Sequence, residues 1–138
     1  MRGEEAPAPA AAGATAPAPV AQQVVFDARA EVHAVTVAEA AETYIVDLVF
    51  ATRYPERHGD DLKKLIQVGA SPRGALALDR CARANAWLRG SDHVTPDDVR
   101  AVVHDCLRHR VILSYEASAE GLSADEVVKK VVEKVAVA

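Results

Sequence analysis

The sequence predicts an all-α fold, in which a small bundle of four to five helices follows an N-terminal arm. Two observations predict the bundle. Apolar residues recur at spacings of three and four from Val24 onward, and residues that commonly begin helices precede several of these stretches. A third observation predicts the arm, because proline and alanine dominate the chain up to residue 23. We expect at most one short two-stranded pairing beside the helices.

Residues 1–23 are predicted to form a disordered arm or linker. They hold hardly any large apolar side chains, so burial cannot offset the entropy lost on ordering. Residues 24–138 are predicted to form one helical domain. The chain of 138 residues is 50% hydrophobic, which is enough for one modest core.

The domain is predicted to begin with two helices. A short helix is expected over residues 24–32. Thr36 and Glu39 form a capping-box pattern, which predicts a second helix that ends at Pro55 and Gly59. The expected inward positions of this second helix recur at helical spacing and are Val37, Ala41, Tyr44, Ile45, Leu48, Val49 and Ala51.

The middle of the chain predicts a short helix over residues 61–68 and a longer helix after it. Ser71 is a suitable N-cap, and Pro72 fits the first helical position, where its missing N–H costs nothing. This helix is expected to run to about Arg89, with Gly90 just beyond its end. Its predicted inner stripe consists of Ala75, Leu78, Ala82 and Ala86.

Two more helices are predicted in the last third of the chain. One begins with Thr95 as N-cap and carries Asp97 and Asp98 in its first turn, where acidic groups favour the helix dipole. The other is capped by Ser123, with Glu126 at the third helical position. Their apolar faces are Val99, Val102, Val103, Cys106 and Leu107 in the first, and Val127, Val128, Val131 and Val135 in the second.

Residues 111–113 leave two possibilities open. They could form a short strand that pairs with His93 and Val94, or a buried loop.

Arg73 is the most informative candidate for function. It lies in the first turn of its helix, at the positive end of the dipole, where a cation is unfavourable by roughly 0.3–1 kcal/mol unless something compensates it. A phosphate would compensate it, because the free backbone N–H groups and the guanidinium can converge on one anion. The alternative is that Arg73 points into water, where the penalty is small.

Missing motifs exclude several chemistries for this chain alone. The sequence has no Gly-x-x-x-x-Gly-Lys-Ser/Thr loop for a nucleoside triphosphate and no strand ending in paired acidic residues for magnesium. No two of its five histidines are four residues apart, and no serine lies in a nucleophile elbow. We therefore predict that this chain is inactive by itself and completes a site carried elsewhere, with no metal of its own.

The composition argues against nucleic-acid and membrane partners. The net charge is −4, and aromatic residues make up only 4% of the chain. No apolar run approaches the length of a membrane span and no signal-peptide pattern opens the chain, so we expect a cytoplasmic protein. Cys81 and Cys106 are expected to be small, buried, reduced residues within helices.

Several segments of the chain form an ordered set: 44–49 with 51–53, 69–73, 82–84 with 88–90, 94–99, 107–110 and 113–117. In this order and spacing they resemble the C-terminal lid subdomain of MoxR-type AAA+ ATPases. The resemblance covers the chain from about residue 24 to 138, and no single segment is specific alone.

The resemblance implies roles for four residues. Arg73 would be the sensor-2 residue, which reaches from the lid to the γ-phosphate of ATP bound on a separate core. Ser71, in the same Gly-Ala-Ser-Pro-Arg segment, is a second candidate for nucleotide binding. Tyr44 and Ile45 would lie near the adenine, although plain core packing is the alternative for both.

The resemblance also implies a setting for the chain. ATP with Mg²⁺ would be bound only by a separate AAA+ core, within a hexameric ring that works as a chaperone-like motor, sometimes on partners with von Willebrand factor A domains. The Walker A, Walker B, sensor 1 and arginine-finger motifs of such a core are absent from this sequence. The chain would then be either a piece of a longer ATPase or a gene product reduced to the lid.

Two other functions remain as alternatives. A stand-alone helical interaction module could dock on an AAA+ ring and regulate it without catalysis of its own. A small helical nucleic-acid binder is the other, and the acidic balance argues against it. The arginines that suggest it are Arg80, Arg83, Arg89, Arg108 and Arg110.

Overall fold

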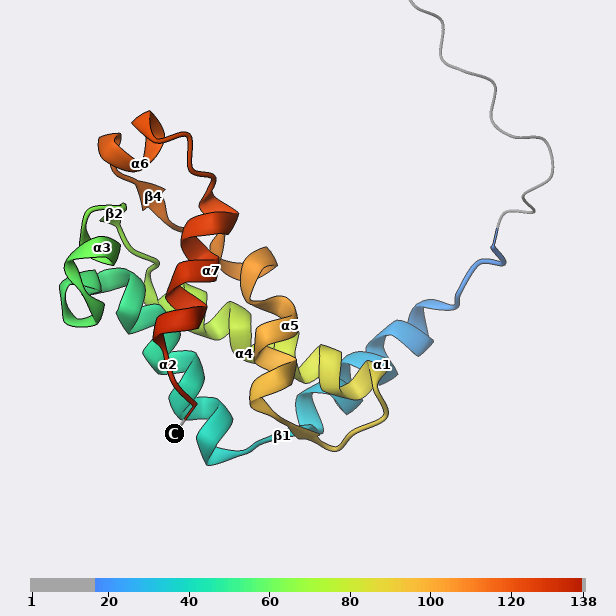
Figure 1. The fold of residues 1–138 in the computed structure, drawn as a ribbon. Coiled ribbons are helices and arrows are strands. Elements are labelled where there is room, and N and C mark those ends of the chain that lie inside the picture. The colour runs from blue at the N-terminus through green and yellow to red at the C-terminus, as the bar shows by residue number, and fades with distance from the viewer. Residues whose placement is uncertain (1–16, 138) are drawn as a thin grey trace, which may run out of the picture.

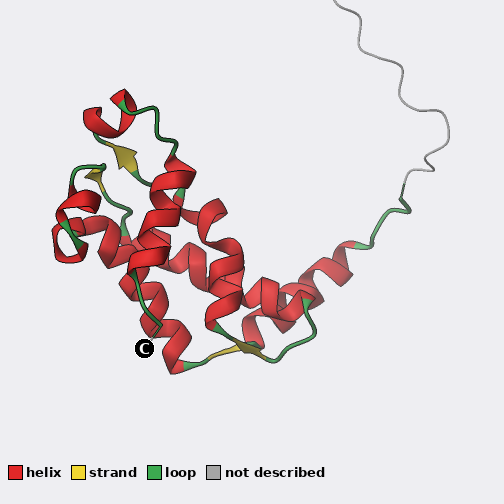
Figure 2. Ribbon diagram, viewed as in Figure 1, coloured by secondary structure: helices red, strands yellow, loops and turns green. Residues whose placement is uncertain are grey.

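A computed structural model describes residues 17–137 and shows a helical bundle from which one helix extends (Figure 1). Helices dominate the described chain (Figure 2), so the predicted all-α class is confirmed. The helices are α1 (Gln22–Ala34), α2 (Glu39–Arg53), the 3₁₀ turn η1 (Pro55–His58), α3 (Asp60–Lys63), α4 (Pro72–Leu88), α5 (Pro96–Leu107), α6 (Tyr115–Ala119) and α7 (Ala124–Lys134). The strands are β1 (Thr36–Val37), β2 (Ile66–Val68), β3 (His93–Val94) and β4 (Ile112–Leu113).

Most of the predicted disordered arm, residues 1–16, lies outside the described residues. Residues 17–21 form no helix or strand, whereas Gln22 and Gln23 already belong to α1. The helix predicted over residues 24–32 is therefore present and is longer at both ends.

The core lies among α2, α4, α5 and α7, and small residues on α4 allow close packing. Ala82 and Ala86 are fully buried, and the most extensive contacts of α4 are with α5. Leu78 is also buried and Ala75 is half-buried, which confirms the predicted inner stripe of this helix. Burying each large aliphatic side chain contributes about 1.5–3 kcal/mol, and the valines of α7 add to this core.

Helix starts and one helix end follow the predicted capping signals. Ser71, Thr95 and Ser123 occupy the N-cap positions of α4, α5 and α7. Gly90 follows α4 with a φ of +78°, a left-handed conformation that favours glycine.

Polar contacts attach α1 to α4. None of the residues of α1 is buried. Trp87 Nε1 donates a hydrogen bond of 2.8 Å to Glu31 Oε2, and the Arg83 guanidinium donates to the main-chain carbonyls of His33 and Val35. These carbonyls lie at the negative end of α1, where a cation is favourable. α1 is thus attached mainly through its last two turns.

Neither possibility left open for residues 111–113 is the one observed, and residues 17–137 form two short strand pairings, where one was expected. Residues Ile112–Leu113 pair antiparallel with Ile66–Val68, not with His93–Val94. His93–Val94 instead pair in parallel with Thr36–Val37. The helix predicted over residues 61–68 is also too long, because Ile66–Val68 are drawn into a strand and only Asp60–Lys63 remain helical.

The predicted capping box of Thr36 and Glu39 is wrong for a related reason. α2 begins at Glu39 with Ala38 in the N-cap position. Thr36 belongs to β1, where its N–H and its hydroxyl both donate to the carbonyl of Asp92, at 2.9 and 3.1 Å. The N–H and hydroxyl of Thr36 are therefore engaged beside the strand pair and do not cap α2.

The two cysteines differ in their environment. Both are free thiols, and Cys106 is buried as predicted, whereas Cys81 is exposed, which corrects the prediction for that residue. Cys81 lies beside the buried stripe of α4 that Leu78 and Ala82 define, not on it. Burial raises the pKa of the Cys106 thiol to about 12, so this thiol stays protonated at neutral pH.

Candidate functional site

The loop that leads into α4 is anchored to the end of α2. The main-chain N–H of Ala70 donates to Thr52 Oγ1 at 2.9 Å, and the Thr52 hydroxyl donates to the carbonyl of Val49 at 2.7 Å. Arg53 Nη1 donates to the carbonyl of Ala70 at 3.2 Å. Thr52 and Ala70 are both fully buried. The position of this loop is therefore determined by the last turn of α2.

Two glycines allow this close packing. A Cβ on Gly69 would lie 2.2 Å from the carbonyl oxygen of Thr52, so only glycine fits against that backbone. A Cβ on Gly74, within the first turn of α4, would lie 3.3 Å from both Ala70 Cβ and Leu107 Cδ2. The first turn of α4 is thus held between the loop and the end of α5.

Arg73 lies on this fixed turn with its side chain in solvent. It is exposed, and it forms no hydrogen bond or ion pair with any residue between 17 and 137. The first turn of α4 carries no acidic residue, whereas the first turns of α5 and α7 each carry two. The positive end of α4 and the guanidinium of Arg73 are therefore both available to an external anion.

Ser71 lies at the same surface as Arg73. Its carbonyl accepts a hydrogen bond of 2.7 Å from the N–H of Gly74, and its side chain is exposed and makes no capping hydrogen bond. The Ser71 hydroxyl therefore accepts no hydrogen bond from the first turn of α4.

Tyr44 and Ile45 lie in the interior, away from this surface. Their exposed fractions are 1% and 4%. The Tyr44 hydroxyl accepts a hydrogen bond of 3.3 Å from Arg100 Nε, and the guanidinium carbon of Arg100 lies 5.4 Å from the ring centroid. This geometry favours the packing role for both residues over contact with an adenine.

Thr52 and Gly69 support the site but are not among its predicted residues. A signal for Gly69 exists, since a glycine just ahead of an N-cap often marks a close backbone approach. No local pattern distinguishes Thr52 from any other threonine near the end of a helix.

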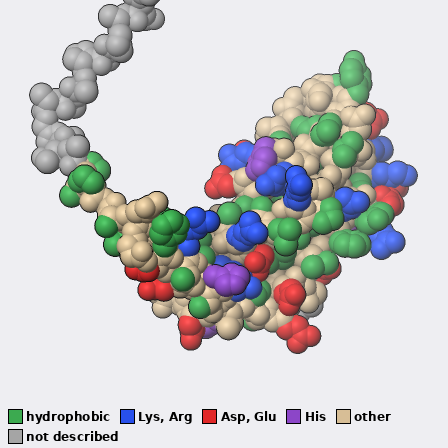
Figure 3. Space-filling view, turned by 180° about the vertical axis from the view of Figure 1, so that it is seen from behind, with side chains coloured by type: hydrophobic (Ala, Val, Ile, Leu, Met, Phe, Trp, Pro, Cys, Tyr) green, Lys and Arg blue, Asp and Glu red, His purple; other side chains and the backbone are tan. Residues whose placement is uncertain are grey.

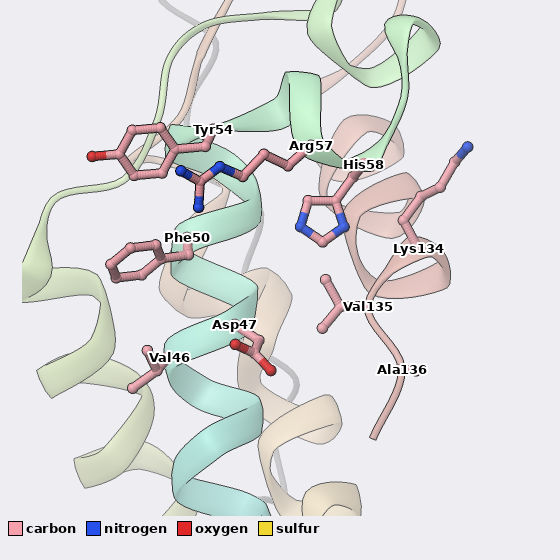
Figure 4. A pocket seen from close by; sticks show the side chains of 9 residues that line it. All are labelled: Val46, Asp47, Phe50, Tyr54, Arg57, His58, Lys134, Val135 and Ala136. Carbon is pink, nitrogen blue, oxygen red and sulfur yellow. The ribbon is translucent and has the colours of Figure 1, made fainter. Parts of the chain in front are cut away.

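A second surface feature is an apolar stripe on α2. Val46, Phe50 and Tyr54 follow one another at helical spacing and are 44%, 49% and 37% exposed. The rings of Phe50 and Tyr54 are 5.6 Å apart, and the guanidinium of Arg57 lies over the Tyr54 ring at 5.0 Å. These side chains line a hollow whose other lining residues include Asp47, His58 and Lys134. In Figure 4, Val46, Phe50 and Tyr54 point to one side of α2, and Asp47, His58 and Lys134 lie on the side of the end of α7.

Other classes of site find little support in the described chain. On the face drawn in Figure 3, basic, acidic and hydrophobic side chains are interspersed, without a broad basic surface. Among residues 17–137, no three His, Cys, Asp or Glu side chains are grouped as a metal site would require. Within the same range, every helix is too short or too polar to cross a membrane.

Comparison with known proteins adds independent observations. The sequence profile of the AAA lid domain family matches residues 61–131. Chaperone MoxR1 of Mycobacterium tuberculosis is 46% identical over 94 residues, which cover 67% of this chain and 25% of the relative. Protein MoxR of Paracoccus denitrificans is 44% identical over 90 residues, which cover 60% of this chain and 26% of the relative. The chain thus spans about a quarter of the length of these relatives.

A similar fold occurs in a solved structure. The crystal structure of a proposed ATPase from Cytophaga hutchinsonii matches with a TM-score of 0.80 and 41% sequence identity. The match covers 84% of this chain and 36% of the Cytophaga chain. The helical domain described above is therefore similar to one part of a longer protein.

Proposed function

This chain belongs to the AAA lid domain family and is a lid of the MoxR type, and we propose that it closes over ATP held by a separate AAA+ core. In this proposal Arg73 is the sensor-2 arginine and contacts the γ-phosphate. The observation that carries the proposal is the exposed guanidinium of Arg73, which has no partner among residues 17–137 and lies on a first turn of α4 that is fixed by the neighbouring loop.

The chain's own residues would contribute charge and position. The core would bind ATP with Mg²⁺, because this sequence has no phosphate-binding loop. Arg73 would donate hydrogen bonds to phosphoryl oxygens and stabilise the charge that develops during transfer. Thr52 and Gly69 would transmit motion, because their contacts make the Arg73 turn move with the whole lid.

We also propose an assembly, which is supported by the family match and by the names of the relatives. AAA+ relatives favour an oligomeric ring, and we propose a hexamer in the cytoplasm. One relative carries the name chaperone, which supports a chaperone-like motor. Proteins with von Willebrand factor A domains are the proposed partners, on the resemblance alone.

The test of the proposed function is Arg73→Ala in an assembly that contains this lid and its AAA+ core. The turnover number for ATP should fall about tenfold or more, whereas the dissociation constant for ATP should change less than about threefold, since the arginine acts mainly on developing charge. Steady-state hydrolysis and equilibrium binding measure the two quantities.

The matched control is Arg80→Ala, which removes an exposed arginine from the same helix. Its turnover should stay near that of the wild type. Unchanged turnover in Arg73→Ala, or an equal fall in both variants, would count against the proposal.

The apolar stripe on α2 supports one alternative function. Three neighbouring large exposed side chains, two on α2 and one at its C-cap, are typical of a docking surface, so the chain could bind an AAA+ ring and regulate it without catalysis. Phe50→Ser should then weaken binding to the ring about tenfold, whereas Leu88→Ser, at a side chain 77% exposed, should not. Isothermal calorimetry against the purified ring distinguishes these outcomes, and equal binding by both variants would exclude the stripe as the docking surface.

A further inference from the structure

Arg110 lies beside the first turn of α4. It follows α5, and its main-chain N–H donates to the carbonyl of Leu107 at 2.9 Å. Its Cδ atom is 3.7 Å from the position that a Cβ on Gly74 would occupy. Gly74 is the residue directly after Arg73, so the side chain of Arg110 lies against the turn that carries Arg73.

The guanidinium of Arg110 lacks an internal partner. Its Nε atom is buried and forms no hydrogen bond with any residue between 17 and 137. Four of the other nine arginines in residues 17–137 bind carboxylates: Arg83 with Asp79, Arg89 with Asp98, Arg100 with Asp97 and Arg108 with Asp105 and Asp125. The other five have no carboxylate partner in that range, but they are exposed to solvent: Arg29, Arg53, Arg57, Arg73 and Arg80.

The Nε–H group of Arg110 is buried, although the residue as a whole is only half-buried. A buried donor without an acceptor is unfavourable. The surroundings add to the cost, because the first turn of α4 has no acidic residue and its N-terminus is itself positive. The site therefore lacks an anion, and the described chain does not supply one.

We propose that Arg110 is a second arginine that binds the polyphosphate chain of the nucleotide, beside Arg73. This inference rests on the proposed function, which brings a triphosphate to the same turn. Two guanidinium groups and a helix N-terminus together match the spread charge of a polyphosphate better than a single carboxylate.

The test uses the full chain and sodium tripolyphosphate as the probe, at constant ionic strength. We expect the Nε–Hε resonance of Arg110 and the amide resonances near Arg73 to shift together in nitrogen-15 NMR spectra. Arg110→Ala should raise the dissociation constant about fivefold, and Arg110→Lys should raise it less. The matched control is Arg108→Ala, two residues away and with the same change of charge, which should bind as the wild type does.

A further variant and a stability measurement separate loss of the guanidinium from loss of packing or folding. Arg110→Met keeps the aliphatic stem beside Gly74 and should bind as weakly as Arg110→Ala if the guanidinium is responsible. Thermal unfolding of every variant shows that it is folded. The inference is overturned if the Arg110 resonance does not move, if the Arg110 variants bind like the wild type, or if Arg108→Ala weakens binding as much.

Turnover separates this inference from the function on which it rests. In an assembly with the core, Arg110→Met should lower ATP turnover, as Arg73→Ala does. Loss of turnover in Arg73→Ala with normal turnover in Arg110→Met would overturn the role of Arg110 and leave the lid function standing. Normal turnover in both variants would contradict both proposals.

Discussion

Gly69→Ala is expected to lower the free energy of unfolding by about 3 kcal/mol. The added methyl group would lie 2.2 Å from the carbonyl oxygen of Thr52 and 2.6 Å from the backbone nitrogen of Arg53. Neither group can move without disturbing the end of α2. The loop must therefore shift away from α2 and lose the hydrogen bond between Ala70 and Thr52.

Chemical denaturation of the purified chain measures this effect. The matched control is Gly90→Ala, because a Cβ there meets nothing within 4 Å and only the φ of +78° opposes it. We expect about 1 kcal/mol of destabilisation for that control. If Gly69→Ala is no less stable than Gly90→Ala, the close packing of the loop on α2 is not as described.

Asp98→Ala is expected to lower the free energy of unfolding by about 3 kcal/mol. The carboxylate is 2% exposed and accepts hydrogen bonds from the N–H and hydroxyl of Thr95, from Asn85 Nδ2 and from Arg89, at 2.8 to 3.2 Å. Removing it takes the capping box from α5 and leaves polar groups without partners. The control is Asp97→Ala, which removes a carboxylate that is 86% exposed. This variant should lower the free energy of unfolding by less than about 1 kcal/mol.

The same carboxylate predicts a dependence of stability on pH. Burial alone would raise the pKa of Asp98, but hydrogen bonds from Arg89, Thr95 and Asn85 outweigh it and hold the pKa well below the usual 3.8. A lowered pKa in the folded state means that the stabilisation is complete above the unfolded value and is lost as the pH falls below about 4. The free energy of unfolding should therefore fall more between about pH 6 and pH 3 for the wild type than for Asp98→Asn. Equal losses in the two proteins would show that Asp98 is not responsible.

The helices could be predicted because their signals are local. Apolar spacing and a cap within four residues are enough to place α4, α5 and α7, and the structure confirms Ser71, Thr95 and Ser123 as their N-caps. The place of Arg73 in the first turn of α4 follows from the same signals.

The strand pairs could not be predicted, because they join residues far apart in the chain. Thr36 pairs with His93, and Ile66 pairs with Leu113, and nothing within either segment identifies its partner. The false capping box at Thr36 arises in the same way, since a distant carbonyl of Asp92 takes the groups that the local pattern assigns to a cap.

The supporting contacts of the candidate site are likewise non-local. Thr52 meets Ala70 only through the packing of α2 on the loop, and Arg110 meets Gly74 only because α5 ends beside the start of α4. Arg73 is recognisable as a candidate from its local sequence, whereas the contacts that fix its position are formed only in the fold.

The central claim is that the lid brings Arg73 to the terminal phosphate of ATP on a separate core. Its most direct test is the structure of the lid with its core and a non-hydrolysable ATP analogue. We expect the Arg73 guanidinium about 2.7–3.2 Å from a γ-phosphate oxygen. The main-chain N–H of Ala70 should still donate its hydrogen bond to Thr52 Oγ1. A closed complex in which Arg73 faces solvent and another residue contacts that phosphate would contradict it.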